Sequence, residues 1–208
     1  MKTRIDINNW PRKNHFQFFS SFEEPFFGIN VQVDCSLAYS NAKSKHKSFF
    51  LYYLYRALLA CNAVENFKYR IIDGEVFLFD NVYAASTVNR PDNSFGFGYF
   101  KYEEDEAIFI EQAQQELMTV RASNTLLSAP WGENEIHFSA LPWFNFTGLS
   151  HARAFSKKDS CPKISFGKLA RGADGKLTMP ISIHAHHGLM DAFHVSQFLE
   201  HFQDLLDQ

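Results

Sequence analysis

The sequence contains little cysteine and no long apolar run. Among its 208 residues there are three cysteines, Cys35, Cys61 and Cys161, and none of them forms a Cys-x-x-Cys pair. Widely separated thiols in odd number are typical of reduced cysteines in a cytoplasm. No stretch approaches the length that spans a bilayer, and the first residues lack the apolar segment of a secretion signal. We therefore expect a cytoplasmic protein without a membrane partner.

The sequence also lacks an excess of basic residues. Its 20 lysines and arginines stand against 23 acidic residues, which gives a net charge of −3. Because nucleic-acid binders carry a basic face, nucleic acid is not an expected partner. Aromatic residues are abundant instead, with 23 Phe, 8 Tyr and 3 Trp. So many rings predict a dense β-rich core, with only a few of them available for an apolar pocket.

No repeat or linker divides the chain, so we expect a single domain over residues 1–208. The apolar patterns predict strands at residues 1–8, 26–38, 82–88, 95–102, 136–140, 163–169 and 177–184. Asp-Gly pairs predict tight turns at residues 73–74, within a hairpin over 67–80, and at 174–175. Helical spacing predicts a helical turn at 10–19 and helices at 44–64, with Ser44 as its N-cap, at 104–122 and at 191–206. The sum is a mixed α/β fold with a large sheet and covering helices.

The segment that points to chemistry is a pair of histidines at the end of a strand-like run. Asp191 follows His187 by four residues and precedes the last helix. An Asp at a helix N-terminus is favoured by the helix dipole and by the free amides of the first turn. Histidine, whose ordinary pKa lies near neutrality, is well suited to take a proton from a hydroxyl. The spacing alone is weak evidence, because a packed His187 and a capping Asp191 explain it equally well.

Three segments together carry a resemblance to a known family. The last is similar to the His-His-x-x-x-Asp-Gly motif of the coenzyme A-dependent acyltransferases; it reads His186-His187-Gly188-Leu189-Met190-Asp191-Ala192. Two others resemble motifs of the chloramphenicol acetyltransferase branch, Asn9-Trp10-Pro11-Arg12-Lys13-Asn14-His15-Phe16 and Ser139-Ala140-Leu141-Pro142-Trp143-Phe144-Asn145-Phe146. The resemblance implies the α/β (α+β) two-layer fold of that family.

The resemblance also implies roles for individual residues. His187 matches the general base that deprotonates the acceptor hydroxyl, and Ser139 matches the hydroxyl that stabilises the tetrahedral oxyanion. Asp191 matches a structural partner of an arginine, which is Arg12 here. Ser165 stands where the family usually has a threonine that holds an active-site water.

Acetyl-CoA is implied as the co-substrate, and no permanently bound cofactor is expected. The sequence has no Gly-rich phosphate loop, so coenzyme A would enter through its pantetheine arm. In the family this arm lies in a tunnel. Lys168 matches a family position near the tunnel, but it is equally well interpreted as a solvent-exposed residue of a strand. The family also implies a homotrimer with each active site between two subunits.

The sequence departs from the family pattern mostly in the acceptor pocket. Phe19 replaces a tyrosine, Phe95 keeps an aromatic ring, Phe97 replaces a small residue, and His151 replaces an apolar side chain. Ala192 stands where the motif usually ends in glycine. Alanine is harmless there only if that position is already helical. Of the nearby aromatic pairs, we assign Phe18-Phe19 to the pocket and Phe26-Phe27 to the core.

A metal site is the alternative interpretation of the histidine cluster His184, His186, His187 and His194. On a strand, residues 184 and 186 share one face and residue 187 points to the other. No Cys or Glu lies within the segment, so the ligand set for zinc is incomplete, and we expect no metal.

Three functional hypotheses follow. The first is an O-acetyltransferase that acts on chloramphenicol or a similar small alcohol. The second keeps the chemistry but has a different, metabolic acceptor, which the changes at Phe19, Phe97 and His151 favour. The third is a non-catalytic binding module, against which the retention of His187 and Ser139 argues.

Overall fold

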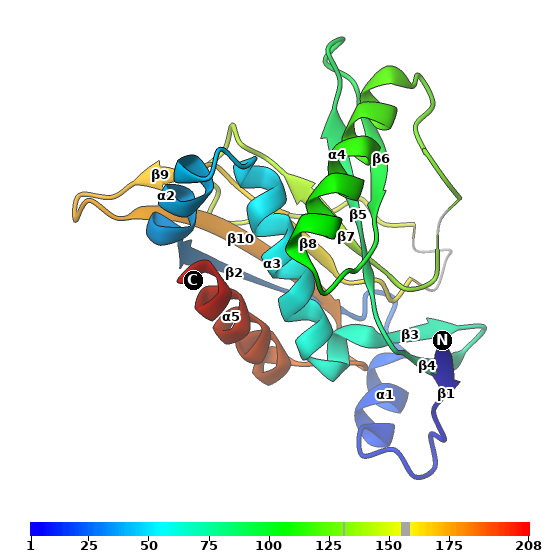
Figure 1. Ribbon diagram of the computed structural model, residues 1–208. Helices are drawn as coiled ribbons and strands as arrows, with labels where there is room; N and C mark the ends of the chain where they lie inside the picture. The colour runs from blue at the N-terminus through cyan, green and yellow to red at the C-terminus, as the bar shows by residue number, and fades with distance from the viewer. Residues whose placement is uncertain (131, 155–158) are drawn as a thin grey trace.

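A seven-stranded mixed sheet forms the centre of the protein in the computed structural model, which describes residues 1–130, 132–154 and 159–208 (Figure 1). Its main path runs β2-β10-β8-β7-β5-β6, and β9 pairs with β10. The pairs β5–β7 and β7–β8 are parallel, and the others are antiparallel. The strands are β2 (Phe26–Asp34), β5 (Tyr83–Asn89), β6 (Phe95–Phe100), β7 (Glu135–Ala140), β8 (Lys163–Phe166), β9 (Ala170–Arg171) and β10 (Leu177–His186).

A second, antiparallel sheet has three strands in the order β1-β4-β3, so that the N-terminal strand pairs with a later hairpin. Its strands are β1 (Lys2–Arg4), β3 (Tyr69–Ile72) and β4 (Glu75–Phe79). Asp73 and Gly74 join β3 to β4 with φ angles of 51° and 83°. Two successive positive φ angles are the requirement of a type I′ turn, so the predicted hairpin is confirmed.

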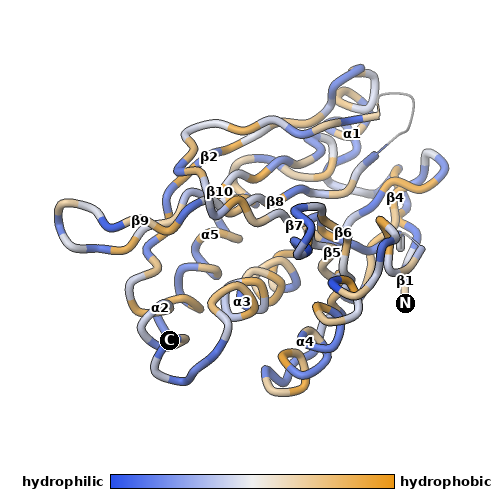
Figure 2. Tube along the Cα trace, turned by 90° about the horizontal axis from the view of Figure 1, so that it is seen from above, coloured by the Kyte–Doolittle hydropathy of each residue, from blue (hydrophilic) through white to orange (hydrophobic). Residues whose placement is uncertain are grey.

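Helices α2, α3, α4 and α5 all lie on one side of the large sheet, as Figure 2 shows in the view from above. The helices are α1 (Lys13–Phe19), α2 (Ser36–Ser44), α3 (Phe49–Ala63), α4 (Glu106–Ala122) and α5 (Ala192–Leu206), with a 3₁₀ turn η1 (Glu65–Lys68) after α3. Within the described part of the chain, no helix is long and apolar enough to cross a membrane.

The prediction of one helix from Ser44 to Val64 was wrong at its start. Ser44 ends the separate helix α2, and His46, with a φ of 51°, turns the chain before α3. The N-cap of α3 is Ser48, whose side chain accepts a hydrogen bond from the backbone of Leu51. Four residues, 45–48, therefore separate the two helices, and the helix predicted to begin at Ser44 begins at Phe49.

The core lies between the large sheet and these helices. The side chains that β7, β8 and β10 turn toward the helices are apolar and buried: Ile136, Phe138, Ile164, Phe166, Ile181, Ile183 and Ala185. They meet the apolar stripe of α5, which is Val195, Phe198, Phe202 and Leu206. Among the described residues, six phenylalanines are fully buried, Phe67, Phe109, Phe138, Phe166, Phe198 and Phe202, which confirms the expected aromatic core.

The opposite face of the large sheet, which we call the far face, carries polar side chains because successive residues of a strand alternate between faces. Ser139, Ser165 and Ser182 are aligned across β7, β8 and β10 and form a hydroxyl row. Two residues along each strand, His137, Lys163 and His184 form a second, nitrogen-bearing row.

The segment 141–154, which we call the cover loop, crosses the far face. Near its start the backbone oxygen of Phe144 accepts a hydrogen bond from the backbone of Lys168, after β8. Further along, the ring of His151 contacts the ring of His184 on β10. Near its end, the guanidinium of Arg153 stacks on Phe26 of β2. The loop thus runs from β8 over β10 to the edge strand β2.

Candidate active site

The turn between β10 and α5 carries the histidine motif. Asp191 caps α5, because its Oδ1 accepts a hydrogen bond of 3.1 Å from the backbone of Phe193. The backbone N–H of Asp191 in turn donates to Nδ1 of His194 at 3.2 Å, which completes a capping box. Ala192 is the first residue of the helix. It is therefore already helical, and alanine at the usual glycine position causes no backbone strain.

Arg12 ties this turn to α1. Its Nη1 lies 2.8 Å from Oδ2 of Asp191, and its Nη2 donates to the carbonyl oxygen of His187 at 3.2 Å. The exposed fractions of the two paired side chains are 12% for Arg12 and 31% for Asp191. Burial raises the pKa of Asp191, but the hydrogen bond from Arg12 and the nearby positive charges outweigh it and hold this pKa below its ordinary value. Asp191 is therefore ionised and fixes the turn.

His187 is held between two phenylalanine rings. The ring of Phe19 is stacked on the imidazole at 4.0 Å between centroids and an angle of 6°. The ring of Phe27 lies at 4.6 Å. The backbone N–H of His187 donates to the oxygen of Pro25 at 2.8 Å. Its Nδ1 is enclosed and has no hydrogen-bond partner among the described residues. Phe27, which the sequence placed in the core, therefore also orients this ring.

His186 points to the other side of the strand and supports the turn. Its Nδ1 accepts a hydrogen bond of 3.1 Å from the backbone of Gly188. The side chain is buried, and burial, together with the charge of Arg153, lowers the pKa of His186 to about 4. The first histidine of the pair is thus a neutral structural residue, and the second is the one available for proton transfer.

A second group of the predicted residues lies on the far face. Ser139 and Ser165 are neighbours in the hydroxyl row. The Oγ of Ser165 is buried and has no hydrogen-bond partner within the described ranges. Phe97 of β6 pairs with Thr87 of β5. Thr87 follows Ser86, which pairs with Phe138 of β7, so Thr87 and Phe97 continue the row that contains Ser139. The ring of Phe95 meets that of Phe97 edge-on at 5.5 Å.

These two groups are not brought together within one chain. His187 is five residues beyond Ser182, which is two strands away from Ser139 in the same row. At the usual rise and strand spacing this separates His187 from Ser139 by roughly 20 Å. The predicted site residues therefore lie in two separate groups, which we call the first and the second half-site: Arg12, Phe19, His187 and Asp191 in the first, and Ser139, Ser165, Phe95 and Phe97 in the second.

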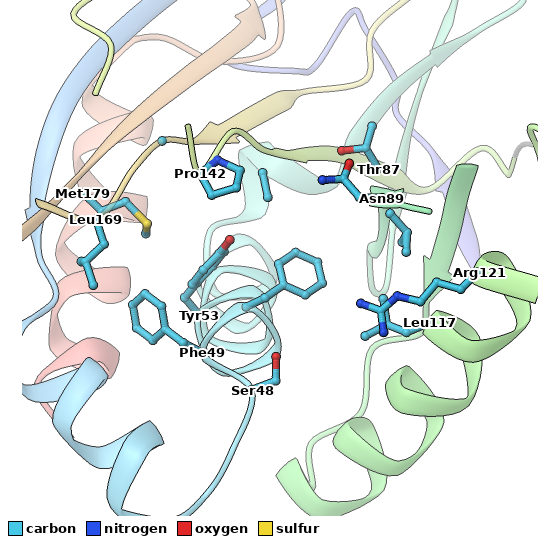
Figure 3. A pocket seen from close by; sticks show the side chains of 14 residues that line it. Ser48, Phe49, Tyr53, Thr87, Asn89, Leu117, Arg121, Pro142, Leu169 and Met179 are labelled. Carbon is cyan, nitrogen blue, oxygen red and sulfur yellow. The ribbon is translucent and has the colours of Figure 1, made fainter. Parts of the chain in front are cut away.

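A cavity of about 310 Å³ opens beside the second half-site. In Figure 3 its walls come from the start of α3 with Phe49 and Tyr53, from the end of β5 with Thr87 and Asn89, and from α4 with Arg121. Its remaining wall includes Ala140, Pro142, Gly167, Leu169 and Met179. Ala140 directly follows Ser139, so the cavity reaches the end of the strand that carries Ser139. The sequence pattern did not indicate most of these residues, because Phe49 and its neighbours lie within the helix predicted over residues 44–64.

Two other predicted residues lie near these groups. Lys168 is exposed and stands between two cavity residues, Gly167 and Leu169. His151 is on the cover loop, with its ring 4.8 Å from that of His184 and at an angle of 85°. Among the described residues, no three His, Cys, Asp or Glu side chains are grouped so as to hold a metal ion.

Comparison with known proteins gives one consistent answer. The sequence model of the chloramphenicol acetyltransferase family matches residues 1–203. Two similar curated proteins are a chloramphenicol acetyltransferase of a Klebsiella species, 27% identical over 99% of this chain and 94% of that protein, and one of Campylobacter coli, 28% identical over 99% of both.

The solved structures agree. A chloramphenicol acetyltransferase structure superposes with a TM-score of 0.89 at 32% identity and covers 99% of this chain and 100% of that one. A probable dihydrolipoamide acetyltransferase from Listeria monocytogenes, 10% identical, shares the fold with a TM-score of 0.68 over 93% of this chain and 88% of that one. The two-layer coenzyme A-dependent acyltransferase fold expected from the sequence is thereby confirmed. The chain belongs to the chloramphenicol acetyltransferase family and is an acyltransferase of that family.

Proposed function

We propose that this protein moves an acetyl group from acetyl-CoA to a hydroxyl of chloramphenicol or a similar small alcohol. The observation that carries the proposal is the way in which the side chain of His187 is held. The imidazole is clamped between Phe19 and Phe27 on a turn that the Arg12–Asp191 pair fixes. A base held this firmly beside a strand end is suited to proton transfer in a defined direction.

The reaction follows from the roles of His187 and Ser139. Nε2 of His187, the nitrogen that the protein does not enclose, takes the proton of the acceptor hydroxyl as its oxygen attacks the thioester carbonyl. The hydroxyl of Ser139 donates a hydrogen bond to the oxyanion of the tetrahedral intermediate. Collapse of the intermediate breaks the carbon–sulfur bond, and the proton on His187 passes to the departing thiolate. Ser165 is assigned to hold a water molecule beside Ser139.

The cavity beside Ser139 supports the placement of acetyl-CoA. Its apolar wall, with Phe49, Tyr53 and Met179, suits the pantetheine arm, and the wall also includes Ala140, the residue after Ser139. Arg121 at its rim and the exposed Lys168 supply positive charge for the phosphates. The acetyl-CoA is a co-substrate and leaves as coenzyme A after each turnover.

We propose that a homotrimer completes the site. A hydroxyl roughly 20 Å away cannot stabilise an oxyanion formed at His187 of the same chain. Exposed aromatic rings flank both half-sites: Phe18, Phe22 and Phe193 near His187, and Phe95, Trp143 and Phe144 near Ser139. Exposed apolar groups of this kind mark interaction surfaces. In a cyclic assembly, the first half-site of one copy packs against the second half-site of the next, and both sets of exposed rings lie at this interface.

The direct test is release of the thiol from acetyl-CoA with and without chloramphenicol, followed by mass spectrometry of the drug. We expect release that depends on the drug and a mono-acetylated product. If the protein binds coenzyme A but releases no thiol in the presence of chloramphenicol, the drug is not an acceptor. The alternative of a different acceptor, which His151 and Phe97 favour, would then hold.

A further inference from the structure

One short segment supports the proposed base from the side of β2. It comprises residues 24–27, the end of a loop and the start of the edge strand, and we call it the support segment. The carbonyl oxygen of Pro25 accepts the hydrogen bond of 2.8 Å from the backbone N–H of His187. The ring of Phe27 lies 4.6 Å from the imidazole. The position of the base therefore depends on how this segment is held.

The strand ladder holds only part of the support segment. β2 lies at the edge of the large sheet and pairs with β10 alone. The ladder between these strands begins with Phe26 opposite His186, so Pro25 lies just outside it. Proline also has no backbone N–H with which to extend the ladder. A contact from elsewhere in the chain is needed to fix residues 24 and 25.

Arg153, near the end of the cover loop, supplies such a contact on both sides of Pro25. Its Nη1 lies 3.2 Å from Oε1 of Glu24, and its guanidinium stacks on the ring of Phe26, 3.4 Å from the centroid. The same Oε1 accepts a hydrogen bond of 3.0 Å from the backbone N–H of Phe26. The side chain of Arg153 is 12% exposed, so the ion pair and the stack are partly shielded from solvent.

The charge of Arg153 also acts on the turn itself. Nδ1 of His186 accepts the hydrogen bond of 3.1 Å from the backbone of Gly188, which only an unprotonated nitrogen can do. Burial is the largest cause that lowers the pKa of His186 to about 4, and the charge of Arg153 is the next. Arg153 therefore helps to preserve a hydrogen bond to the residue directly after His187.

We infer that Arg153 is a positioning residue for His187, on which it acts through the support segment. This inference rests on the proposed acetyl transfer, in which His187 is the base. A shift of the Pro25 carbonyl moves the backbone of His187 and tilts the imidazole away from the acceptor hydroxyl. Displacement of a reacting group by a fraction of an ångström lowers the rate of a reaction strongly. If Arg153 only anchors the cover loop, its loss lowers the melting temperature but leaves the kcat of the folded protein unchanged.

The test variant is Arg153→Met, which keeps an unbranched apolar side chain and removes the charge. With acetyl-CoA and chloramphenicol, we expect kcat to fall about tenfold, because the base is displaced. KM for both substrates should stay within about twofold, because binding does not involve Arg153. Arg153→Lys keeps the charge without the planar guanidinium and should recover part of kcat. Arg4→Met, which removes an exposed cation on β1, should leave kcat as in the parent.

Glu24→Gln tests the other half of the ion pair. Glu24 is exposed, so its replacement is the milder change and keeps the test decisive if Arg153→Met does not fold. We expect Glu24→Gln to lower kcat by several-fold and to lower it little further in the Arg153→Met protein, because the two side chains act as a unit. Effects on kcat that simply multiply would contradict an action of Arg153 through the support segment.

NMR of the histidine side chains requires no turnover. The imidazole resonances of His187 are assigned by their absence from the His187→Ala spectrum. We expect them to shift in Arg153→Met, while those of the exposed His201 stay in place. Unshifted His187 resonances, or a parent-like kcat, in the folded variant would overturn the inference. If the resonances shift but the parent protein transfers no acetyl group to any alcohol, Arg153 still positions the imidazole and the proposed function fails.

Discussion

Replacing His187 with alanine is expected to lower the rate of acetyl transfer about a hundred- to ten-thousandfold, the contribution typical of a positioned general base. The loss follows because His187 is the ring held between Phe19 and Phe27, whereas its neighbour His186 is buried against the turn. The fold should persist, because the Arg12–Asp191 pair and the contact of Arg12 with the backbone oxygen of residue 187 do not need the imidazole. Thiol release from acetyl-CoA and circular dichroism measure the two quantities.

The matched control for this variant is His201→Ala. His201 is an exposed histidine on α5, far along the helix from the capping box. Its replacement should change neither rate nor fold. Parent-like transfer in the folded His187→Ala protein would contradict the assignment of the base.

Replacing Ser139 with alanine is expected to reduce kcat about a hundred- to a thousandfold, as the loss of one oxyanion donor does in other acyl-transfer enzymes. Ser139 is half-buried, and the next residue of the strand, Ala140, lines the cavity. KM for acetyl-CoA should change much less than kcat, because the hydrogen bond forms mainly in the transition state. Steady-state kinetics of the purified variant separates the two constants.

Ser139→Thr is the matched variant, because it keeps a hydroxyl at the same position. It should retain more of the rate than Ser139→Ala. An alanine variant with the parent's kcat, or a threonine variant no better than alanine, would show that the hydroxyl is not the oxyanion donor.

The local signals in the sequence were sufficient for the turn that carries His187. Asp191 precedes a clear apolar stripe, and both the N-cap and the start of α5 are where this pattern predicts them. The same holds for the Asp73-Gly74 turn, where two residues determine the backbone geometry. Such features depend on neighbours in the sequence, which is why the sequence reveals them.

Features that depend on distant pairing could not be predicted in this way. The hydroxyl row exists because β7, β8 and β10 align Ser139, Ser165 and Ser182, and no local pattern specifies that register. The separation of His187 from Ser139 has the same origin. The contact of Arg153 with Phe26 is of the same kind, because it forms only when the cover loop crosses the sheet.

The prediction of a helix that begins at Ser44 failed for a different reason. His46 adopts a positive φ, a conformation that glycine or asparagine signals far more often than histidine does. Ser44 and Ser48 are both residues that commonly cap a helix, and the sequence pattern predicts the N-cap at Ser44 although Ser48 is the one that caps α3. The error hid the N-terminus of α3, which lines the cavity at Ser48 and Phe49.

The most direct test of the divided active site is complementation between two inactive variants. His187→Ala and Ser139→Ala chains with different affinity tags are produced together, and assemblies that contain both chains are purified. If each site takes His187 from one copy and Ser139 from the next, about a third of the sites in cyclic trimers that contain both chains have both native residues. We predict that acetyl transfer recovers to about that fraction of the parent rate. A mixed assembly no more active than the two variants assayed separately would contradict a site shared between chains.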